Sequence, residues 1–151
     1  MSAPRARSVP TRHAHRWRYR LRWALTGYSV VLILVLGWPT PTAPVVGTLG
    51  WANDLVRAAG AASWLDPQTM EFTANIALFV PFGLLLALVL RQGQWWVAML
   101  GGFGVSMFAE VTQGLFLPGR SGTVSDVVAN TTGTIIGTGI AVVLARRQPQ
   151  P

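Results

Sequence analysis

One carboxylate, Glu110, lies in the middle of a largely apolar run of the sequence, residues 95–117. A charged side chain at the centre of a membrane-spanning helix costs about 2.5–3.5 kcal/mol on insertion scales. Such a group has to be paired, protonated or in contact with a polar cavity. Polar side chains that could serve as partners follow closely: Gln113, Arg120, Asp126 and Asn130. Chemistry in this chain is therefore expected around Glu110.

Two carboxylates in different surroundings can divide the roles of general acid and general base. Glu110, removed from water, would act as the acid or base, while Asp126 would stay ionised beside Arg120. The candidate catalytic residues are Glu110 and Asp126, and the candidate ligand-binding residues are Asn75, Gln113, Arg120 and Asn130. The competing interpretation is a buried ion network that only holds helices together.

The composition indicates a membrane protein. Of the 151 residues, 51% are hydrophobic and 11% are charged, whereas soluble domains carry about 25% charged residues. The chain has no cysteine, which excludes disulfides, thiolate metal sites and cysteine nucleophiles. His13 and His15 are too few for a metal site. We therefore expect no metal and no cofactor.

The net charge of +7 is concentrated at the start of the chain. Seven of the twelve basic residues lie within the first 22 positions: Arg5, Arg7, Arg12, Arg16, Arg18, Arg20 and Arg22. A basic tail of this kind can bind nucleic acid. Here it directly precedes a hydrophobic segment, as the cytoplasmic flank of a membrane helix does, so no nucleic-acid partner is expected.

Four hydrophobic segments predict an all-α membrane protein, a bundle of four transmembrane helices. The expected helices are 21–38, 68–91, 95–117 and 124–145, within one transmembrane domain, 21–147. A basic tail, 1–20, expected to be disordered, precedes this domain, and a short tail, 148–151, follows it. A cleaved signal peptide is the alternative for the first segment, but prolines crowd the place where the cleavage site would lie.

The arginines predict the orientation of the bundle. With the N-terminus inside the cell, cytoplasmic segments hold ten arginines, and only Arg57 and Arg120 lie outside. Cytoplasmic loops of membrane proteins carry the excess of basic residues. Both termini are therefore expected in the cytoplasm.

The outer loop, 39–67, contains apolar residues near helical spacing between positions 49 and 64. This pattern predicts a short helix lying in the membrane interface, with Trp51 and Trp64 as anchors. The alternative is a plain connecting loop. Asp66 followed by Pro67 is typical of a helix start, so the second membrane helix is expected to begin there.

Polar residues of three expected helices lie at a similar depth in the membrane. Glu110 lies about 10 Å below the outer end of its helix, seven residues away. Asp126 and Asn130 occupy the first two turns of the last helix, and Asn75 lies at a similar height in the second. We expect these side chains to meet near the outer surface.

Two residue patterns with a spacing of four accompany them. Gly102, Ser106, Glu110 and Gly114 form one small and polar stripe, and Gly133, Gly137 and Ala141 form a ridge of small residues. Such a ridge permits close approach of helices, which we interpret as packing within the chain rather than dimerisation. Ser121 and Ser125 are interpreted as helix caps.

These residues fall into three blocks that resemble the VanZ-like family of small bacterial membrane proteins. The blocks are Asn75-Ile-Ala-Leu-Phe-Val-Pro-Phe-Gly83, Glu110-Val-Thr-Gln113, and Arg120 followed by Ser125-Asp126-Val-Val-Ala-Asn130-Thr-Thr-Gly133. They resemble the family's N-I-x-L-F-x-P-x-G, E-x-x-Q and R-x(n)-D-x-x-x-N-x-x-G blocks, in that order. The resemblance runs from Asn75 to about Ala145.

The resemblance implies a multi-pass protein of the bacterial plasma membrane, in a family with members linked to teicoplanin resistance. It implies no established reaction. Our leading hypothesis is a cell-envelope protein that binds membrane lipid or a lipid-linked wall intermediate at an outward-facing polar pocket, with Arg120 as a phosphate contact. The alternatives are an acid/base enzyme acting on an envelope lipid or glycan, and a packing or assembly module without a ligand. The oligomeric state is left open.

Overall fold

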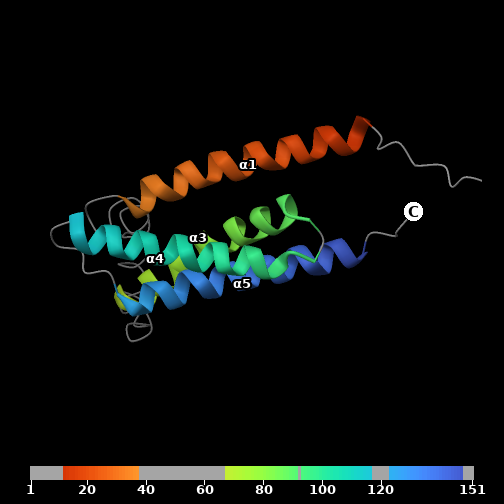
Figure 1. Cartoon of the computed structure of the whole chain (residues 1–151). Helices are drawn as coiled ribbons and strands as arrows, with labels where there is room; N and C mark the ends of the chain where they lie inside the picture. Colours follow the sequence, from red (N-terminus) through yellow and green to blue (C-terminus); the bar gives the residue numbers. More distant parts are fainter. Residues whose placement is uncertain (1–11, 38–66, 92, 117–122, 148–151) are drawn as a thin grey trace, which may run out of the picture.

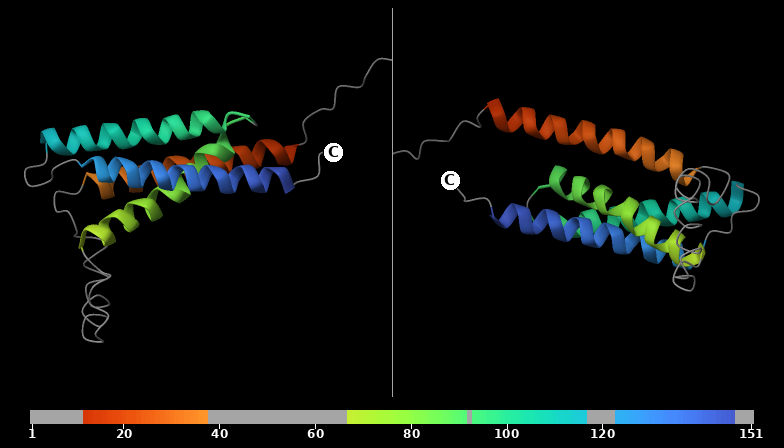
Figure 2. Two further views of the ribbon diagram at one scale, coloured as in Figure 1. Left: turned by 90° about the horizontal axis from the view of Figure 1, so that it is seen from below. Right: turned by 180° about the vertical axis from the view of Figure 1, so that it is seen from behind.

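The computed structural model describes residues 12–37, 67–91, 93–116 and 123–147. Within them lie four helices: α1 (Arg12–Leu36), α3 (Pro67–Val89), α4 (Trp95–Phe116) and α5 (Val124–Arg147). The described residues contain no strand, as the all-α prediction requires. Consecutive helices alternate in direction, so the start of α1 and the end of α5 lie at the same end of the bundle (Figure 1 and Figure 2).

The helix boundaries agree with the predicted ones except at the start of α1. This helix begins at Arg12 rather than at 21, so part of the segment expected to be disordered is helical. The apolar stretch marks only where a helix crosses lipid, whereas arginine and alanine favour helix as well. The second membrane helix begins at Pro67, as expected. The predicted interfacial helix over 49–64, with Trp51 and Trp64, lies outside the described residues.

Three helices are long and apolar enough to cross a membrane: α1 over Arg16–Leu36, α3 over Gln68–Val89 and α5 over Val124–Arg147. The predicted fourth span, α4, has 22 residues, or about 33 Å of helix. This helix contains the carboxylate Glu110 and is not among these three. The chain thus has the elements of a multi-pass membrane protein.

The outer surface of the bundle is apolar along its length. The exposed side chains include Val30, Ile33 and Leu34 of α1, Leu100, Phe103, Met107, Phe108, Val111 and Leu115 of α4, and Ile135, Ile136, Ile140, Val143 and Leu144 of α5. Soluble monomers rarely expose contiguous apolar patches beyond a few hundred Å². This surface fits contact with lipid, and it includes one whole side of α4.

Glycines permit the close crossing of α3 and α5. A methyl group on Gly137 would overlap the carbonyl oxygen of Val80, and one on Gly133 would overlap that of Ile76. From the other side, a methyl group on Gly83 would overlap the carbonyl oxygen of Thr134. The small-residue ridge of α5 therefore packs against α3 of the same chain, which confirms the predicted role of Gly133 and Gly137.

Helix α1 packs against α3 through an apolar cluster and one polar contact. Leu32 and Leu36 of α1 are buried with Phe79 and Phe82 of α3. Beside them, the Tyr28 hydroxyl donates a hydrogen bond of 2.6 Å to the carbonyl oxygen of Leu78. Tyr28 is half-buried, and this bond gives its hydroxyl a partner in α3.

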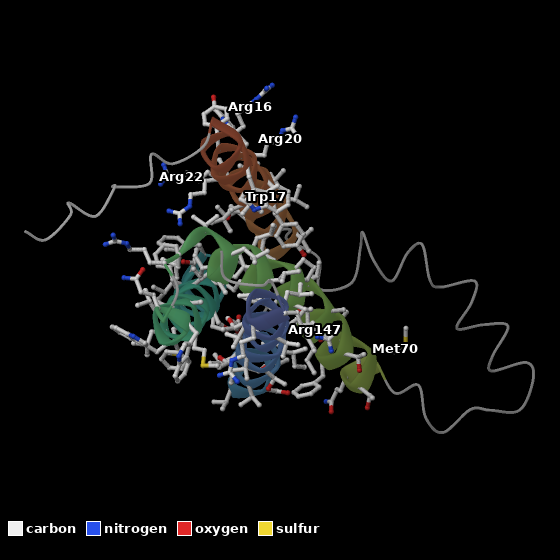
Figure 3. All side chains as sticks on the ribbon, turned by 90° about the vertical axis from the view of Figure 1, so that its right-hand side faces the viewer. Arg16, Trp17, Arg20, Arg22, Met70 and Arg147 are labelled. Carbon is white, nitrogen blue, oxygen red and sulfur yellow. The ribbon has the colours of Figure 1, made fainter. Side chains whose placement is uncertain are left out.

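Among the described residues, basic side chains gather at one end of the bundle and acidic side chains at the other. At the arginine end, where α1 begins and α5 ends, the exposed basic side chains are Arg16, Arg18, Arg20, Arg22, Arg91, Arg146 and Arg147; Figure 3 views the bundle from this end. At the carboxylate end, where α3 and α5 begin and α4 ends, lie Glu71, Glu110 and Asp126. The candidate functional residues belong to the carboxylate end.

Candidate functional site

Thr123 forms the N-cap of α5 and organises the carboxylate end. Its hydroxyl oxygen accepts a hydrogen bond of 3.2 Å from the backbone N–H of Asp126, three residues later. The same hydroxyl donates to Asp126 Oδ2 at 2.9 Å. Threonine at a cap, with an acid at the third helical position, is close to the capping-box pattern. Thr123 and Asp126 together therefore stabilise the start of α5.

Glu110 completes this cap from a different helix. Its Oε2 atom accepts a hydrogen bond of 2.9 Å from the backbone N–H of Thr123. In a capping box, the acid three residues after the cap would accept that N–H. Here Glu110 of α4 supplies the acceptor instead. Only 8% of the Glu110 surface is exposed. Glu110 thus joins the end of α4 to the start of α5.

Asp126 extends the network to α3. The Asn75 amide donates a hydrogen bond of 2.8 Å to Asp126 Oδ1. Glu110 is buried, as is Asn75, whereas Asp126 is half-buried. The two carboxylates therefore sit in different surroundings, while both accept hydrogen bonds from Thr123. The arrangement links three helices through the side chains of four residues and the backbone N–H of Thr123.

The electrostatics of the helix start favour both carboxylates. Unpaired N–H groups give the first turn of a helix a partial positive charge. Asp126 lies in the first turn of α5, and Glu110 accepts the N–H of the residue that caps it. This interaction offsets part of the cost of holding Glu110 among apolar helices.

Helices α4 and α5 continue this contact below the carboxylates in an antiparallel register. Four residues below Glu110, the Ser106 hydroxyl accepts a hydrogen bond of 3.0 Å from the Asn130 amide. Four residues further along each helix, Gly102 lies against the Thr134 side chain. A methyl group on Gly102 would overlap that side chain. We call this row of contacts the α4–α5 seam. Ser106, Asn130 and Thr134 within it are fully buried.

The comparisons with known proteins point to one family. The VanZ/LLP1 family model matches residues 23–145, which is most of the chain. The chain belongs to the VanZ/LLP1 family. The match confirms the resemblance that the three sequence blocks indicated, and it extends upstream into α1. No match was found among curated proteins or among solved structures.

The structure brings three of the six predicted site residues of this VanZ/LLP1 protein into one hydrogen-bonded group. Asn75, Glu110 and Asp126 meet around Thr123. Asn130 lies one turn deeper, in the α4–α5 seam. Arg120 lies outside the described residues.

Gln113 has a different position from the one expected. Its amide donates a hydrogen bond of 2.8 Å to the carbonyl oxygen of Leu36, at the end of α1. The last carbonyls of a helix have no partner within it, so Gln113 satisfies one of them from α4. Gln113 lies on α4, as Glu110 does, but its hydrogen bond is to α1 of this VanZ/LLP1 protein.

The cap of α5 corrects one sequence interpretation and adds a residue to the site. Ser125 is exposed, and Ser121 lies outside the described residues. Because α5 begins at Val124, the cap is Thr123. The Thr-x-x-Asp spacing of Thr123 and Asp126 was the signal that could have identified it. The small and polar stripe of α4 is also shorter than predicted, because Gly114 is exposed.

The described part of this VanZ/LLP1 protein contains no group of three His, Cys, Asp or Glu residues that could hold a metal ion. Carboxylate oxygens and one hydroxyl dominate the site, and its backbone and amide donors bond to these oxygens. A site rich in acceptors suits ligands that carry O–H or N–H donors.

Proposed function

We propose that this VanZ/LLP1 protein binds a membrane lipid or a lipid-linked wall intermediate at the carboxylate end of its bundle and contributes to teicoplanin-type glycopeptide tolerance. The observation that carries the proposal is the convergence of Asn75, Glu110 and Asp126 on Thr123, from three helices of an apolar bundle. Sugar hydroxyls and amines of a headgroup would donate to the carboxylate oxygens. Arg120, which lies between α4 and α5 in the sequence, would contact the phosphate.

The proposal includes an orientation. The arginine end would face the cytoplasm, because basic residues accumulate on that side of membrane proteins. The exposed Trp17, Tyr19, Trp95 and Trp96 side chains would lie in the interface at this end, as aromatic belts do. The site would then face the outer leaflet of the bacterial plasma membrane, with both termini inside and α4 as the fourth span.

Native mass spectrometry of lipid that co-purifies with the protein tests the proposal. Wild type is expected to retain a defined headgroup class, which Glu110→Gln and Arg120→Ala should each lose. Ser125→Ala is the matched control, because Ser125 lies next to Asp126 but is exposed. Retention of the same lipid by all variants would contradict the proposal.

An acid/base enzyme is the second candidate, favoured by one observation. The two carboxylates share Thr123 but differ in burial, and such a difference can separate acid and base roles. A modified envelope lipid or glycan, present with wild type and absent with Glu110→Gln, would support this activity. A packing module without a ligand would instead lose only abundance and thermal stability in Glu110→Gln.

A further inference from the structure

The first turns of α1 expose arginines and aromatic side chains close together. The residues over 16–23 are, in order, Arg16, Trp17, Arg18, Tyr19, Arg20, Leu21, Arg22 and Trp23. All of them except the leucine are exposed, and the rings of Tyr19 and Trp23 meet edge to face with centroids 5.9 Å apart. In Figure 3, Arg16 and Arg20 project away from the other helices, whereas Arg22 projects to another side of α1. We call residues 16–23 the basic–aromatic segment.

This segment lies at the level where α4 begins. Gln113 of α4 bonds to the carbonyl oxygen of Leu36 in α1, and the two helices run in the same direction. Arg18 and Trp95 each lie 18 residues, or about 27 Å of helix, before this contact. Trp95 and Trp96 are exposed, as the aromatic residues of the segment are. Such aromatic residues lie at the headgroup level of a membrane, so the arginines among them lie there too.

The described part of the chain offers no carboxylate near these arginines. Its acidic residues, Glu71, Glu110 and Asp126, all belong to the carboxylate end. The stretches 1–11 and 148–151, which adjoin the arginine end in the sequence, contain no acidic residue. At the headgroup level, an exposed guanidinium meets the phosphate oxygens of lipids, which it can bind through two parallel N–H donors.

We propose that the basic–aromatic segment of α1 binds the headgroup of an anionic phospholipid, with Arg18 and Arg22 as the main phosphate contacts. These two residues are four apart and share a face of the helix. Leu25, three residues later, continues this face and packs against the apolar cluster between α1 and α3. A lipid on this side can contact α1 and the bundle at once. The phosphate of a zwitterionic lipid is neutralised by its own ammonium group, so the arginines favour a headgroup with net negative charge.

Native mass spectrometry with added lipid tests this binding separately from the carboxylate end. The purified protein is titrated with phosphatidylglycerol and with phosphatidylcholine of equal acyl chains. Wild type is expected to prefer phosphatidylglycerol by at least about tenfold, because each basic residue near an anionic surface contributes about fivefold. Equal affinities for the two lipids would overturn the proposal. Glu110→Gln should keep the preference, so this proposal and lipid binding at the carboxylate end can fail independently.

The arginines at the end of α5 supply a charge-matched control. Starting from the bond between Ser106 and Asn130, eleven residues lead back along α4 to Trp95 and forward along α5 to position 141. Arg146 therefore lies five residues, or about 8 Å, beyond the level of Trp95. Arg146 and Arg147 have no aromatic neighbours in α5. They carry the same charge as the proposed pair but lie farther out.

Two double variants that remove equal charge locate the binding site. Arg18→Gln combined with Arg22→Gln is expected to abolish the preference for phosphatidylglycerol, whereas Arg146→Gln combined with Arg147→Gln is expected to keep it. Thermal unfolding verifies that both variants fold. Retention of the preference by the first variant would overturn the proposal. An equal loss in both variants would overturn it as well, because net charge alone would then explain the binding.

Discussion

Alanine at position 137 tests the crossing that positions α3 and α5. The new methyl group would overlap the carbonyl oxygen of Val80 and lie 2.7 Å from the backbone nitrogen of Leu84. Both neighbours are backbone atoms of α3, so no rotation of a side chain can relieve the overlap. The two helices would have to move apart where they pack most closely.

The magnitude follows from two opposing terms. Overpacking a well-packed interior costs about 1–3 kcal/mol, and a clash with backbone on two sides belongs at the upper end. The higher helix propensity of alanine opposes this cost, because replacing glycine by alanine within a helix stabilises it by about 1 kcal/mol. We therefore expect Gly137→Ala to lower the free energy of unfolding by about 2 kcal/mol. Gly139→Ala should raise it by up to about 1 kcal/mol, because nothing lies within 4 Å of a methyl group there.

Thermal unfolding of the two variants in the same detergent compares them under matched conditions. For a chain of this length each kcal/mol corresponds to roughly 2–4 °C in Tm. Gly137→Ala should therefore unfold roughly 6–12 °C below Gly139→Ala. Equal Tm values for these two variants would refute the packing of α5 on α3 through its glycines.

Three further substitutions address the cap, the α1 contact and the fourth span. Thr123→Val should cost about 0.5–2 kcal/mol of stability through loss of the helix cap, and Thr123→Ser should restore it; equal unfolding of the two would contradict the cap. Tyr28→Phe should cost about 0.5–1.5 kcal/mol through its lost hydrogen bond, and unchanged denaturant unfolding would argue against that bond. Phe108→Arg, on the exposed side of α4, should reduce membrane insertion by about 2.5–3.5 kcal/mol; insertion equal to wild type in a glycosylation-mapping assay would mean that α4 does not span.

The helices were predictable because hydropathy and the residues that start or end helices agree along most of the chain. Pro67 begins α3, and the polar residues 91–94 separate α3 from α4. The start of α1 was not predicted, because arginines and aromatic residues continue a helix without extending its apolar stretch. Hydropathy locates the part of a helix that fits lipid, not the full length of the helix.

The depth at which the polar side chains meet was predictable, but their individual contacts were not. Counting residues from the helix ends placed Asn75, Glu110 and Asp126 at one height, and hydrogen bonds join all three to the same cap. One partner of Glu110 is the backbone N–H of Thr123. Every residue except proline has such an N–H, so the sequence does not indicate which one a carboxylate will bind. The neighbour that a polar side chain contacts depends on the rotation of its helix about its axis. Gln113, for example, bonds to the end of α1.

The central claim is that the carboxylates around Thr123 form a ligand site, and a lipid titration tests it most directly. Native mass spectrometry would measure the affinity of the purified protein for a lipid-linked disaccharide and for a plain phospholipid of equal acyl length. The account predicts that wild type prefers the lipid-linked sugar at least tenfold, about 1.4 kcal/mol, and that Glu110→Gln and Asp126→Asn lose this preference. Equal affinities in wild type, or a preference that survives both substitutions, would contradict it.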